Sequence, residues 1–308
     1  ENPLTPELLL RWVQLGAVSP VMRTQANGVA FPPRARPQVL DPDQVANWRR
    51  YTKLHTQLYP YIAAAEHVYQ RRGLPIMRHL GLVHPDDATA AATEDQFLFG
   101  PDLLAAPVLD QAASERSVYL PRGRWIDLWR SAAYRERSGG LRLGPAAVLR
   151  GSRTITMPAP LEELPLLVRA GALLPLLPPS VDTLTSYAKR DPELVSLAEK
   201  RASLRLLAFP RGRTRAGFYD GERLRSAETR AGWRLKIRGD TSRGYRLQAS
   251  FRALKDPFLP CRVAVSEREL APRRWSFDRR KDVLRARFRG RRLTLTVSDR
   301  RCAQRGIR

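Results

Sequence analysis

The sequence predicts an α/β segment followed by two all-β sandwich domains. Apolar residues recur at helical spacing through most of residues 1–72, and one short apolar strand follows at 74–83. From Phe97 onward the pattern changes to short strands separated by turns, which is typical of β-sandwiches. The strand at 74–83 is of the kind that parallel sheets bury on both faces, so it needs further strands beside it.

Two helices are expected before that strand. The first carries an apolar stripe formed by Leu8, Leu9, Trp12, Val13 and Leu15. The second should open with Asp41 or Asp43 near its N-cap. Pro60 should kink or split it, because proline lacks the amide hydrogen that a helix interior uses. Gly73 should end it.

The remaining elements are expected to be mostly strands. In the first sandwich they are 97–99, 103–108, 117–120, 125–128, 153–157 and 166–170. A Pro-rich linker follows at 175–179, and a short polar helix is expected over 192–201. In the second sandwich the expected strands are 203–209, 215–219, 232–238, 244–251, 262–265, 283–288 and 292–297.

The chain carries 54 basic and 30 acidic residues, and the excess is uneven. Residues 178–308 hold 34 basic and 14 acidic groups. A segment this basic could attract nucleic acid, an anionic membrane or acidic glycans. Its basic residues are almost all arginine and are spread through strand-like segments. We therefore expect no specific nucleic-acid partner, and only salt-sensitive adhesion to polyanions.

Composition also limits which cellular compartment and which cofactors are expected. No apolar run reaches the roughly 18 residues that a transmembrane helix needs, so no membrane partner is expected. Cys261 and Cys302 could form one disulfide, which would favour a secreted or extracytoplasmic location, or remain two buried thiols. The cysteines and the four histidines lack metal-ligand spacing, and there is no nucleotide-binding loop. No metal or other cofactor is expected.

Several motifs in residues 1–177 resemble glycoside hydrolase family 31. They are Arg11-Trp12-Val13-Gln14-Leu15-Gly16-Ala17, Pro20-Val21-Met22-Arg23, Pro75-Ile76-Met77-Arg78-His79-Leu80, Asp95-Gln96-Phe97-Leu98-Phe99-Gly100-Pro101-Asp102 and Val168-Arg169-Ala170-Gly171-Ala172. The resemblance implies that 1–84 is the terminal segment of a (β/α)8 catalytic barrel and that 85–177 is a proximal β-sandwich. Residues 178–308 would be a diverged, basic distal β-sandwich, matched only by position and by the turn at 217–221.

The resemblance also implies an activity: retaining hydrolysis of terminal α-linked glucose or a related sugar in an α-linked oligosaccharide or glycoside. Retaining hydrolysis uses two carboxyl groups about 5–5.5 Å apart. In the family both are aspartates on earlier barrel strands, and no acid here matches either motif. The chain alone, lacking nucleophile and acid/base, is therefore predicted to be inactive. By itself it would expose apolar helix faces, so poor solubility or association, for instance as a homo-oligomer, is expected.

Two residues are predicted to bind substrate. Gln25 stands where the family usually has a histidine that bonds a hydroxyl of the bound sugar. Glutamine can still bond a hydroxyl but cannot titrate. A loop glutamine without a ligand is the alternative. Arg23 is the second candidate, although a structural ion pair that holds the loop is favoured over direct contact with sugar.

Other polar and aromatic residues are expected to be structural. The acids expected in loops, turns or the interdomain seam include Asp86, Asp87, Asp102 and Asp127. His79, where the family usually has proline, should be a satisfied structural histidine. The tryptophans expected to pack in the sandwiches, and not to stack on sugar, are Trp125, Trp129, Trp233 and Trp275.

Three further interpretations stay open. Pro20-Val21-Met22-Arg23-Thr24 and Gly73-Leu74-Pro75-Ile76-Met77-Arg78 also resemble the sulfoquinovosidase branch of the family. Gln25 and the missing carboxylates are compatible with a non-catalytic carbohydrate-binding or scaffold protein. A polyanion-binding module built on the basic distal part would show a steep salt dependence of binding to heparin or DNA.

Overall fold

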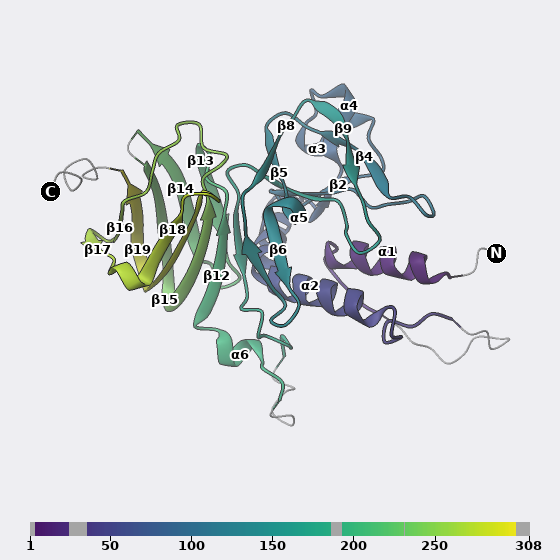
Figure 1. Cartoon of the computed structure of the whole chain (residues 1–308), viewed down its shortest axis with the longest axis horizontal. Coiled ribbons are helices and arrows are strands. Elements are labelled where there is room, and N and C mark those ends of the chain that lie inside the picture. The colour runs from purple at the N-terminus through teal and green to yellow at the C-terminus, as the bar shows by residue number, and fades with distance from the viewer. Residues whose placement is uncertain (1–3, 25–35, 186–192, 231, 300–308) are drawn as a thin grey trace.

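The computed structural model describes residues 4–24, 36–185, 193–230 and 232–299. Two helices and a six-stranded sheet occupy one end of the molecule, and a large curved sheet occupies the other (Figure 1). Helices therefore come first and sheets follow, as the sequence predicts.

Helix α1 (Pro6–Ala17) begins as its residues dictate. The hydroxyl of Thr5 accepts a hydrogen bond from the amide of Leu8 at 3.1 Å, and proline occupies the first turn, where its missing N–H costs nothing. The buried face of α1, which includes Leu10, Val13 and Ala17, lies against α2 (Val45–Arg72).

Helix α2 is not split at Pro60, which corrects one of the two outcomes expected there; a kink stays a prediction. It runs unbroken for 28 residues through Pro60, because residues on both sides of the proline, among them Tyr51 and Tyr61, are buried in one apolar cluster. Packing thus outweighs the local cost of proline. The N-cap is Gln44, without a side-chain bond, and Asp43 lies next to it, as expected of an acid near this position. The Asp41 carboxylate accepts from the Gln38 amide at 2.7 Å. The predicted stop at Gly73 is confirmed.

Three polar side chains of α2 bond the backbone of segments far away in sequence. The Tyr51 hydroxyl donates to the carbonyl of Glu162 at 3.1 Å and accepts from the amide of Leu164 at 2.8 Å. The Gln57 side-chain amide donates to the carbonyl of Gly139 at 2.7 Å. The Tyr61 hydroxyl donates to the carbonyl of Phe99 at 2.7 Å and accepts from the amide of Asp102 at 2.8 Å. Helix α2 is thereby fixed to the β-structure along its buried length.

The expected parallel-type strand over 74–83 is wrong. Only β1 (Met77–Arg78) is a strand, and it pairs antiparallel with β2 (Phe97–Phe99). Residues Leu80–Val83 form the short helix α3, whose N-cap His79 accepts from the Gly81 amide at 3.1 Å. Leu82 and Val83 are 53% and 38% exposed, so the apolar run is not buried on both faces.

The six-stranded sheet has the order β1-β2-β3-β10-β5-β8, with every pairing antiparallel. Its other strands are β3 (Leu103–Ala105), β5 (Arg124–Asp127), β8 (Ala147–Arg150) and β10 (Leu166–Arg169). Two further pairs flank it: β4 (Glu115–Leu120) with β9 (Arg153–Pro158), and β6 (Ala132–Arg135) with β7 (Gly140–Leu143). Short helices α4 (Ala88–Ala91) and α5 (Leu128–Ser131) connect these strands.

The nine-stranded sheet is built on two long strands, β15 (Gly232–Ser250) and β19 (Val283–Ser298). The others are β11 (Leu173–Leu176), β12 (Ser203–Ala208), β13 (Arg213–Gly217), β14 (Arg223–Thr229), β16 (Arg262–Val265), β17 (Arg268–Glu269) and β18 (Trp275–Asp278). The short helix α6 (Leu197–Lys200) and a 3₁₀ turn at Pro272–Arg274 lie between strands.

Each long strand was expected as two separate strands, which is wrong. The first half of β15 pairs antiparallel with β14, its second half pairs in parallel with β12, and the register shifts between Arg238 and Arg243. Leu235 from one half and Leu247 from the other belong to the same apolar cluster. The sheet therefore folds over its own core, with the shift at the bend. Strand β11 pairs with β12 in this sheet. The expected domain boundary between residues 177 and 178 stays a prediction.

Gly100 makes the closest approach between α2 and the six-stranded sheet. Its φ is +59°, and a Cβ placed there would lie 2.6 Å from the Tyr61 hydroxyl oxygen. Gly73 has a similar φ of +67°, but a Cβ there would meet nothing within 4 Å. The two glycines thus share a backbone conformation and differ in their surroundings.

We expect Gly100→Ala to destabilise the protein more than Gly73→Ala. Both variants should lose about 1–2 kcal/mol from the left-handed backbone. Gly100→Ala should lose roughly 1–3 kcal/mol more, because Tyr61 must move. Urea unfolding of the two variants measures the difference, and equal losses would show that Tyr61 does not constrain this turn.

A buried arginine holds the bend of β15. Arg243 is fully buried, and its Nε donates to Glu222 Oε1 at 2.6 Å. The same guanidinium bonds Asp220, the carbonyl of Arg201 and the Tyr219 hydroxyl. Glu222 is also buried, at 1% exposure. Each charge is therefore stable only while its partner is present.

We expect Arg243→Met to lower the free energy of unfolding by about 3–5 kcal/mol, because it leaves Glu222 buried and unpaired. The double variant Arg243→Met/Glu222→Met should recover part of that loss, and Asp220 keeps its bond from Arg201 at 2.8 Å. Arg292→Met is the control, since its pair with Asp240 is exposed and should contribute at most about 1 kcal/mol. Thermal and urea unfolding test this, and equal effects of the two single variants would contradict it.

Candidate functional site

The two predicted substrate residues lie after α1. Gln25 lies outside the described residues. Arg23 is exposed to solvent, and within the described residues it forms no ion pair. The structural ion pair favoured from the sequence is thus not found in this part of the chain. A contact between sugar and Arg23 or Gln25 stays a prediction.

The helix that leads to Arg23 is anchored by another arginine, which the sequence did not single out. Arg11 is 8% exposed, and its guanidinium bonds four backbone carbonyls. They belong to Ala113, Ala159, Pro160 and Glu163, at 2.9–3.2 Å. Burial lowers the pKa of Arg11. Gln14, one turn later, donates to the carbonyl of Leu161 at 2.6 Å. Helix α1 is thereby fixed to the loop that precedes β10.

The chain leaves α1 in a defined direction. Met22 packs against the apolar core, and a Cβ on Gly16 would lie 3.3 Å from its side chain. Val21 is 75% exposed, and Arg23 also faces solvent. His55 of α2 holds the end of α1 through its Nδ1, 3.2 Å from the carbonyl of Ala17, and burial lowers the pKa of His55.

Helix α1 has a second apolar face, which is exposed. Leu8 and Trp12 stand on successive turns of α1 and are 40% and 60% exposed, and Leu4, which directly precedes the N-cap Thr5, is 37% exposed. Leu8 and Trp12 are four residues apart and therefore share one side of the helix. Contiguous exposed apolar side chains are uncommon on a monomer's surface and mark a contact surface. We call Leu4, Leu8 and Trp12 the α1 apolar face.

The acids weighed from the sequence have structural partners. Asp102 is 1% exposed and pairs with Arg169 at 2.9 Å; burial raises the pKa of Asp102, and Arg169 opposes that rise. Asp87 caps α4 and accepts from Tyr119, a bond that lowers the pKa of Asp87. Asp127 caps α5, and burial raises its pKa. The structural roles expected for these three acids are confirmed.

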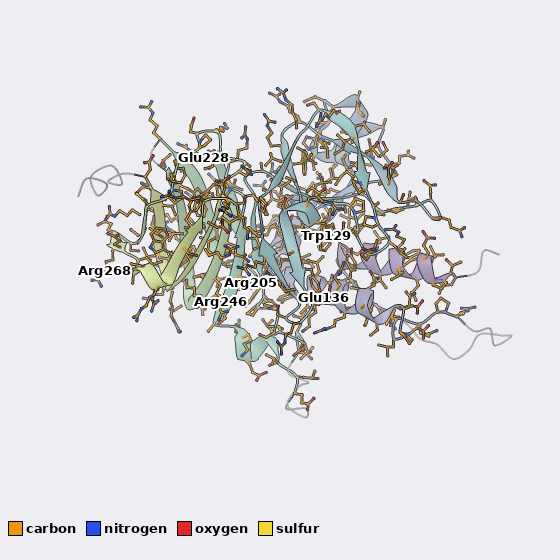
Figure 2. All side chains as sticks on the ribbon, viewed as in Figure 1. Trp129, Glu136, Arg205, Glu228, Arg246 and Arg268 are labelled. Carbon is orange, nitrogen blue, oxygen red and sulfur yellow. The ribbon has the colours of Figure 1, made fainter. Side chains whose placement is uncertain are left out.

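The tryptophans also act as structural residues. Trp125 and Trp233 are 1% and 0% exposed, which confirms their place in the core. Trp129 is half-buried beside α2, where its indole N–H donates to the carbonyl of Leu164 at 2.7 Å (Figure 2). Trp275 is half-buried on β18. The buried pair has no surface on which to stack a sugar ring.

Across the described ranges, His, Cys, Asp and Glu side chains form no group of three or more that could hold a metal ion. In the same part of the chain, none of the helices is long and apolar enough to span a membrane. Cys261 is disulfide-bonded, and Cys302 lies outside the described residues.

Three curated relatives each match between 44% and 63% of the chain. It is 32% identical to the isomaltosyltransferase of Sporosarcina globispora over 180 residues, which is 56% of this chain and 15% of that protein. It is 35% identical to the sulfoquinovosidase of Escherichia coli over 140 residues, covering 44% of this chain and 20% of that protein. The lysosomal α-glucosidase of Rattus norvegicus is 32% identical, with 63% and 21% covered. The chain thus spans about a fifth of the length of these relatives.

Solved structures share the fold over nearly the full chain. The cycloalternan-forming enzyme of Listeria monocytogenes, in complex with a pentasaccharide substrate, superposes with a TM-score of 0.73 at 20% identity. That match covers 97% of this chain and 28% of the enzyme. The GH31 dextranase of Flavobacterium johnsoniae gives a TM-score of 0.71 at 22% identity, with 95% and 37% covered. At these identities the likeness is one of fold.

Two family models divide the matched region between them. The model described as the TIM-barrel domain of glycosyl hydrolases family 31 matches residues 1–65. The model described as the family 31 C-terminal domain matches residues 73–174. Together they cover more than half of the chain, and they confirm the expected fold class, a barrel end followed by β-rich structure. The chain belongs to glycoside hydrolase family 31.

Proposed function

We propose that this chain is the C-terminal portion of a retaining α-glycosidase that hydrolyses terminal α-linked glucose or a related sugar. The nucleophile and the acid/base come from outside the chain, and the chain alone is inactive. The observation that carries this proposal is the α1 apolar face together with the structural roles of Asp87, Asp102 and Asp127.

The exposure of the α1 apolar face supports contact with a further layer of protein that this chain does not supply. Burying a side chain as large as leucine or tryptophan contributes about 1.5–3 kcal/mol relative to leaving it in water. Leu8 and Trp12 are exposed on a helix whose opposite face is packed, and Leu4 is exposed just before that helix, so a further layer of protein would stabilise this surface. The rest of a (β/α)8 barrel is such a layer, because helices surround the strands in that fold.

The chain's own contribution to the site would be to position the segment after α1. Arg11 and Gln14 fix α1, Met22 fixes the exit, and Arg23 and Gln25 follow. A guanidinium and an amide both bond sugar hydroxyls, the first as a donor and the second as donor and acceptor. We propose that Arg23 and Gln25 bind the substrate there, while carboxylates from outside this chain do the chemistry.

The relatives are named for different sugars, so the substrate has to be measured. They include α-glucosidases, an α-xylosidase and two sulfoquinovosidases. An α-glucoside is our first choice. A sulfoquinovoside is the second, supported by identities of 33% and 35% to the two sulfoquinovosidases.

The first test compares two polypeptides: the 308 residues alone, and the same residues with the protein sequence encoded upstream in the gene. With 4-nitrophenyl α-glucoside and 4-nitrophenyl α-sulfoquinovoside, the longer polypeptide should hydrolyse one substrate and release the α-anomer first by NMR. The 308 residues alone should show no rate above background. Hydrolysis by the shorter polypeptide would contradict the proposal. Sugar binding without hydrolysis by the longer one would point to a carbohydrate-binding protein.

The second test addresses the α1 apolar face. In the longer polypeptide, Trp12→Gln should lower the melting temperature, because Trp12 would be buried against the added residues. In the 308 residues alone the same change should leave the melting temperature nearly unaltered and reduce self-association in sedimentation. Leu109→Gln is the control, since Leu109 is 68% exposed and lies outside this face. Equal behaviour of Trp12→Gln in both polypeptides would show that nothing covers α1.

A further inference from the structure

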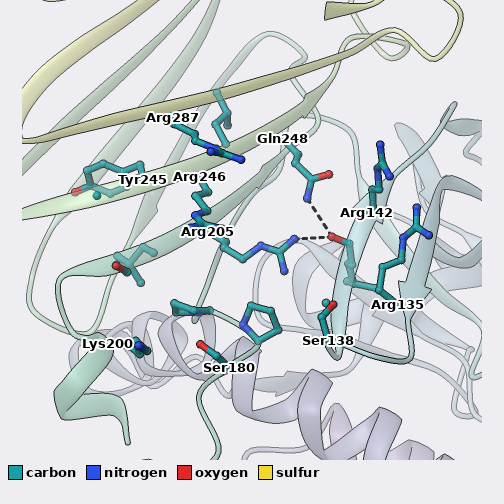
Figure 3. Close-up of a pocket in the computed structure, with 18 of the residues that line it drawn as sticks. Arg135, Ser138, Arg142, Ser180, Lys200, Arg205, Tyr245, Arg246, Gln248 and Arg287 are labelled. Carbon is teal, nitrogen blue, oxygen red and sulfur yellow. Dashed lines mark hydrogen bonds between the residues drawn. The ribbon is translucent and has the colours of Figure 1, made fainter. Parts of the chain in front are cut away.

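A groove of about 1210 Å³ lies between the β6–β7 pair and the outer face of β12, β15 and β19. Of the described residues that line it, ten are arginine, two are lysine and one, Asp182, is acidic. Figure 3 shows Arg135 and Arg142 on one wall, opposite Arg205, Arg246 and Arg287. In Figure 2, the labels of Arg205 and Arg246 mark the distal-sheet side of this groove, and the label of Glu136 marks the β6–β7 side.

Three of these arginines form a row across neighbouring strands, which we call the arginine row. Arg205 of β12 stands opposite Arg246 of β15, and Arg246 stands opposite Arg287 of β19. Their neighbours along each strand are buried, so the arginines point outward. Like charges directly opposite each other destabilise a sheet. The arginine row therefore costs the free protein stability.

The opposite wall is held in place by hydrogen bonds to the backbone of β7. Arg205 donates to the carbonyl of Leu141 at 2.6 Å, and Gln248 donates to the same oxygen at 3.0 Å. Arg285 donates to the carbonyl of Leu143 at 2.8 Å. The spacing of the two walls is thus built into the fold.

Among the described residues that line the groove, the positive charge is not neutralised from within. Asp182 already pairs with Lys53. Burial lowers the pKa of Arg205, and Arg246 lowers it further; burial and Arg142 do the same for the pKa of Arg285. Arginine stays charged throughout the physiological range. An anion entering the groove would relieve this repulsion and meet guanidinium groups that can bind it in a bidentate manner.

We propose that this groove binds an acidic polysaccharide, a glycan chain that carries sulfate or carboxylate groups. A polymer with spaced charges suits a row of arginines that faces a second basic wall. Binding of single-stranded nucleic acid relies on exposed aromatic side chains on which bases stack. The aromatic residues described in this groove, Tyr245 and Phe288, are 1% and 4% exposed and offer no such surface. The proposal goes beyond the proposed hydrolysis and does not depend on it.

The test uses fluorescently labelled dextran sulfate and uncharged dextran of the same length, with binding to the full chain followed by anisotropy at about 0.15 M salt. Dextran sulfate should bind and dextran should not. Arg246→Gln/Arg287→Gln should raise the Kd for dextran sulfate roughly tenfold or more, because two charge-assisted contacts are lost. The free variant should melt no lower than the original protein, since like charges have been removed.

The matched control is Arg215→Gln/Arg225→Gln. These two arginines also stand opposite each other, on β13 and β14, are exposed and lie outside the groove. The control should raise the Kd less than about threefold at the same salt concentration. Equal losses from both double variants would overturn the proposal, since binding would then follow total charge. Tighter binding of a single-stranded oligonucleotide of equal charge would overturn it in favour of nucleic acid.

Discussion

Helix α2 satisfies backbone polar groups from inside the core, and the placement of the surrounding β-structure depends on that constraint. Tyr51, Gln57 and Tyr61 are all buried along the helix, and each bonds the backbone of a different distant segment. A buried amide or carbonyl without a partner costs about 1–3 kcal/mol, so each segment is favoured only where the helix meets it. Leu177, at the start of the distal sheet, adds a bond from its amide to the carbonyl of Gln57 at 2.9 Å.

An arginine-rich composition is handled in three different ways in this fold. Arg11 is buried against backbone carbonyls, which carry only partial charge. Arg243 is buried against carboxylates, which neutralise it. The arginine row lines a groove whose one acid among the described residues, Asp182, already pairs with Lys53. Of these three arrangements, only the last leaves net charge available to a partner.

Much of the fold follows from the periodicity of apolar residues in the sequence. The elements that were predicted wrongly have physical explanations. Many strands from Phe97 onward were predictable, because alternation along a strand leaves a direct signal, whereas β6, β7, β8, β14, β17 and β18 were not predicted. The apolar run at 74–83 was misjudged because composition cannot show that His79 caps a helix. Pro60 was misjudged because a tertiary contact outweighed a local rule. Strands β15 and β19 were each divided in two, since a polar, bending stretch looks like a turn in sequence.

The candidate site shows the same limit. The motif around Arg11 was visible in the sequence, but its role was not, because the carbonyls that it bonds lie about 100 or more residues away. The arginine row was equally hidden. Arginines at every second position in the first half of β19 are plain in the sequence, yet their alignment with Arg205 and Arg246 exists only once three strands are in register.

The two long strands also determine how the distal sheet can form. Strands β15 and β19 pass through both halves of the sheet, and they pair with each other along nearly their full length. Both halves are built from the same two strands, so the halves cannot unfold as separate cooperative units. Residue 232 faces residue 298, and residue 250 faces residue 283, so much of the pairing joins positions far apart along the chain. High contact order of this kind slows folding, because the loop must close before its contacts form. The basic distal part should therefore be the slow step as the chain emerges from the ribosome, with the arginine-bearing strand faces open to polyanions until β19 is complete.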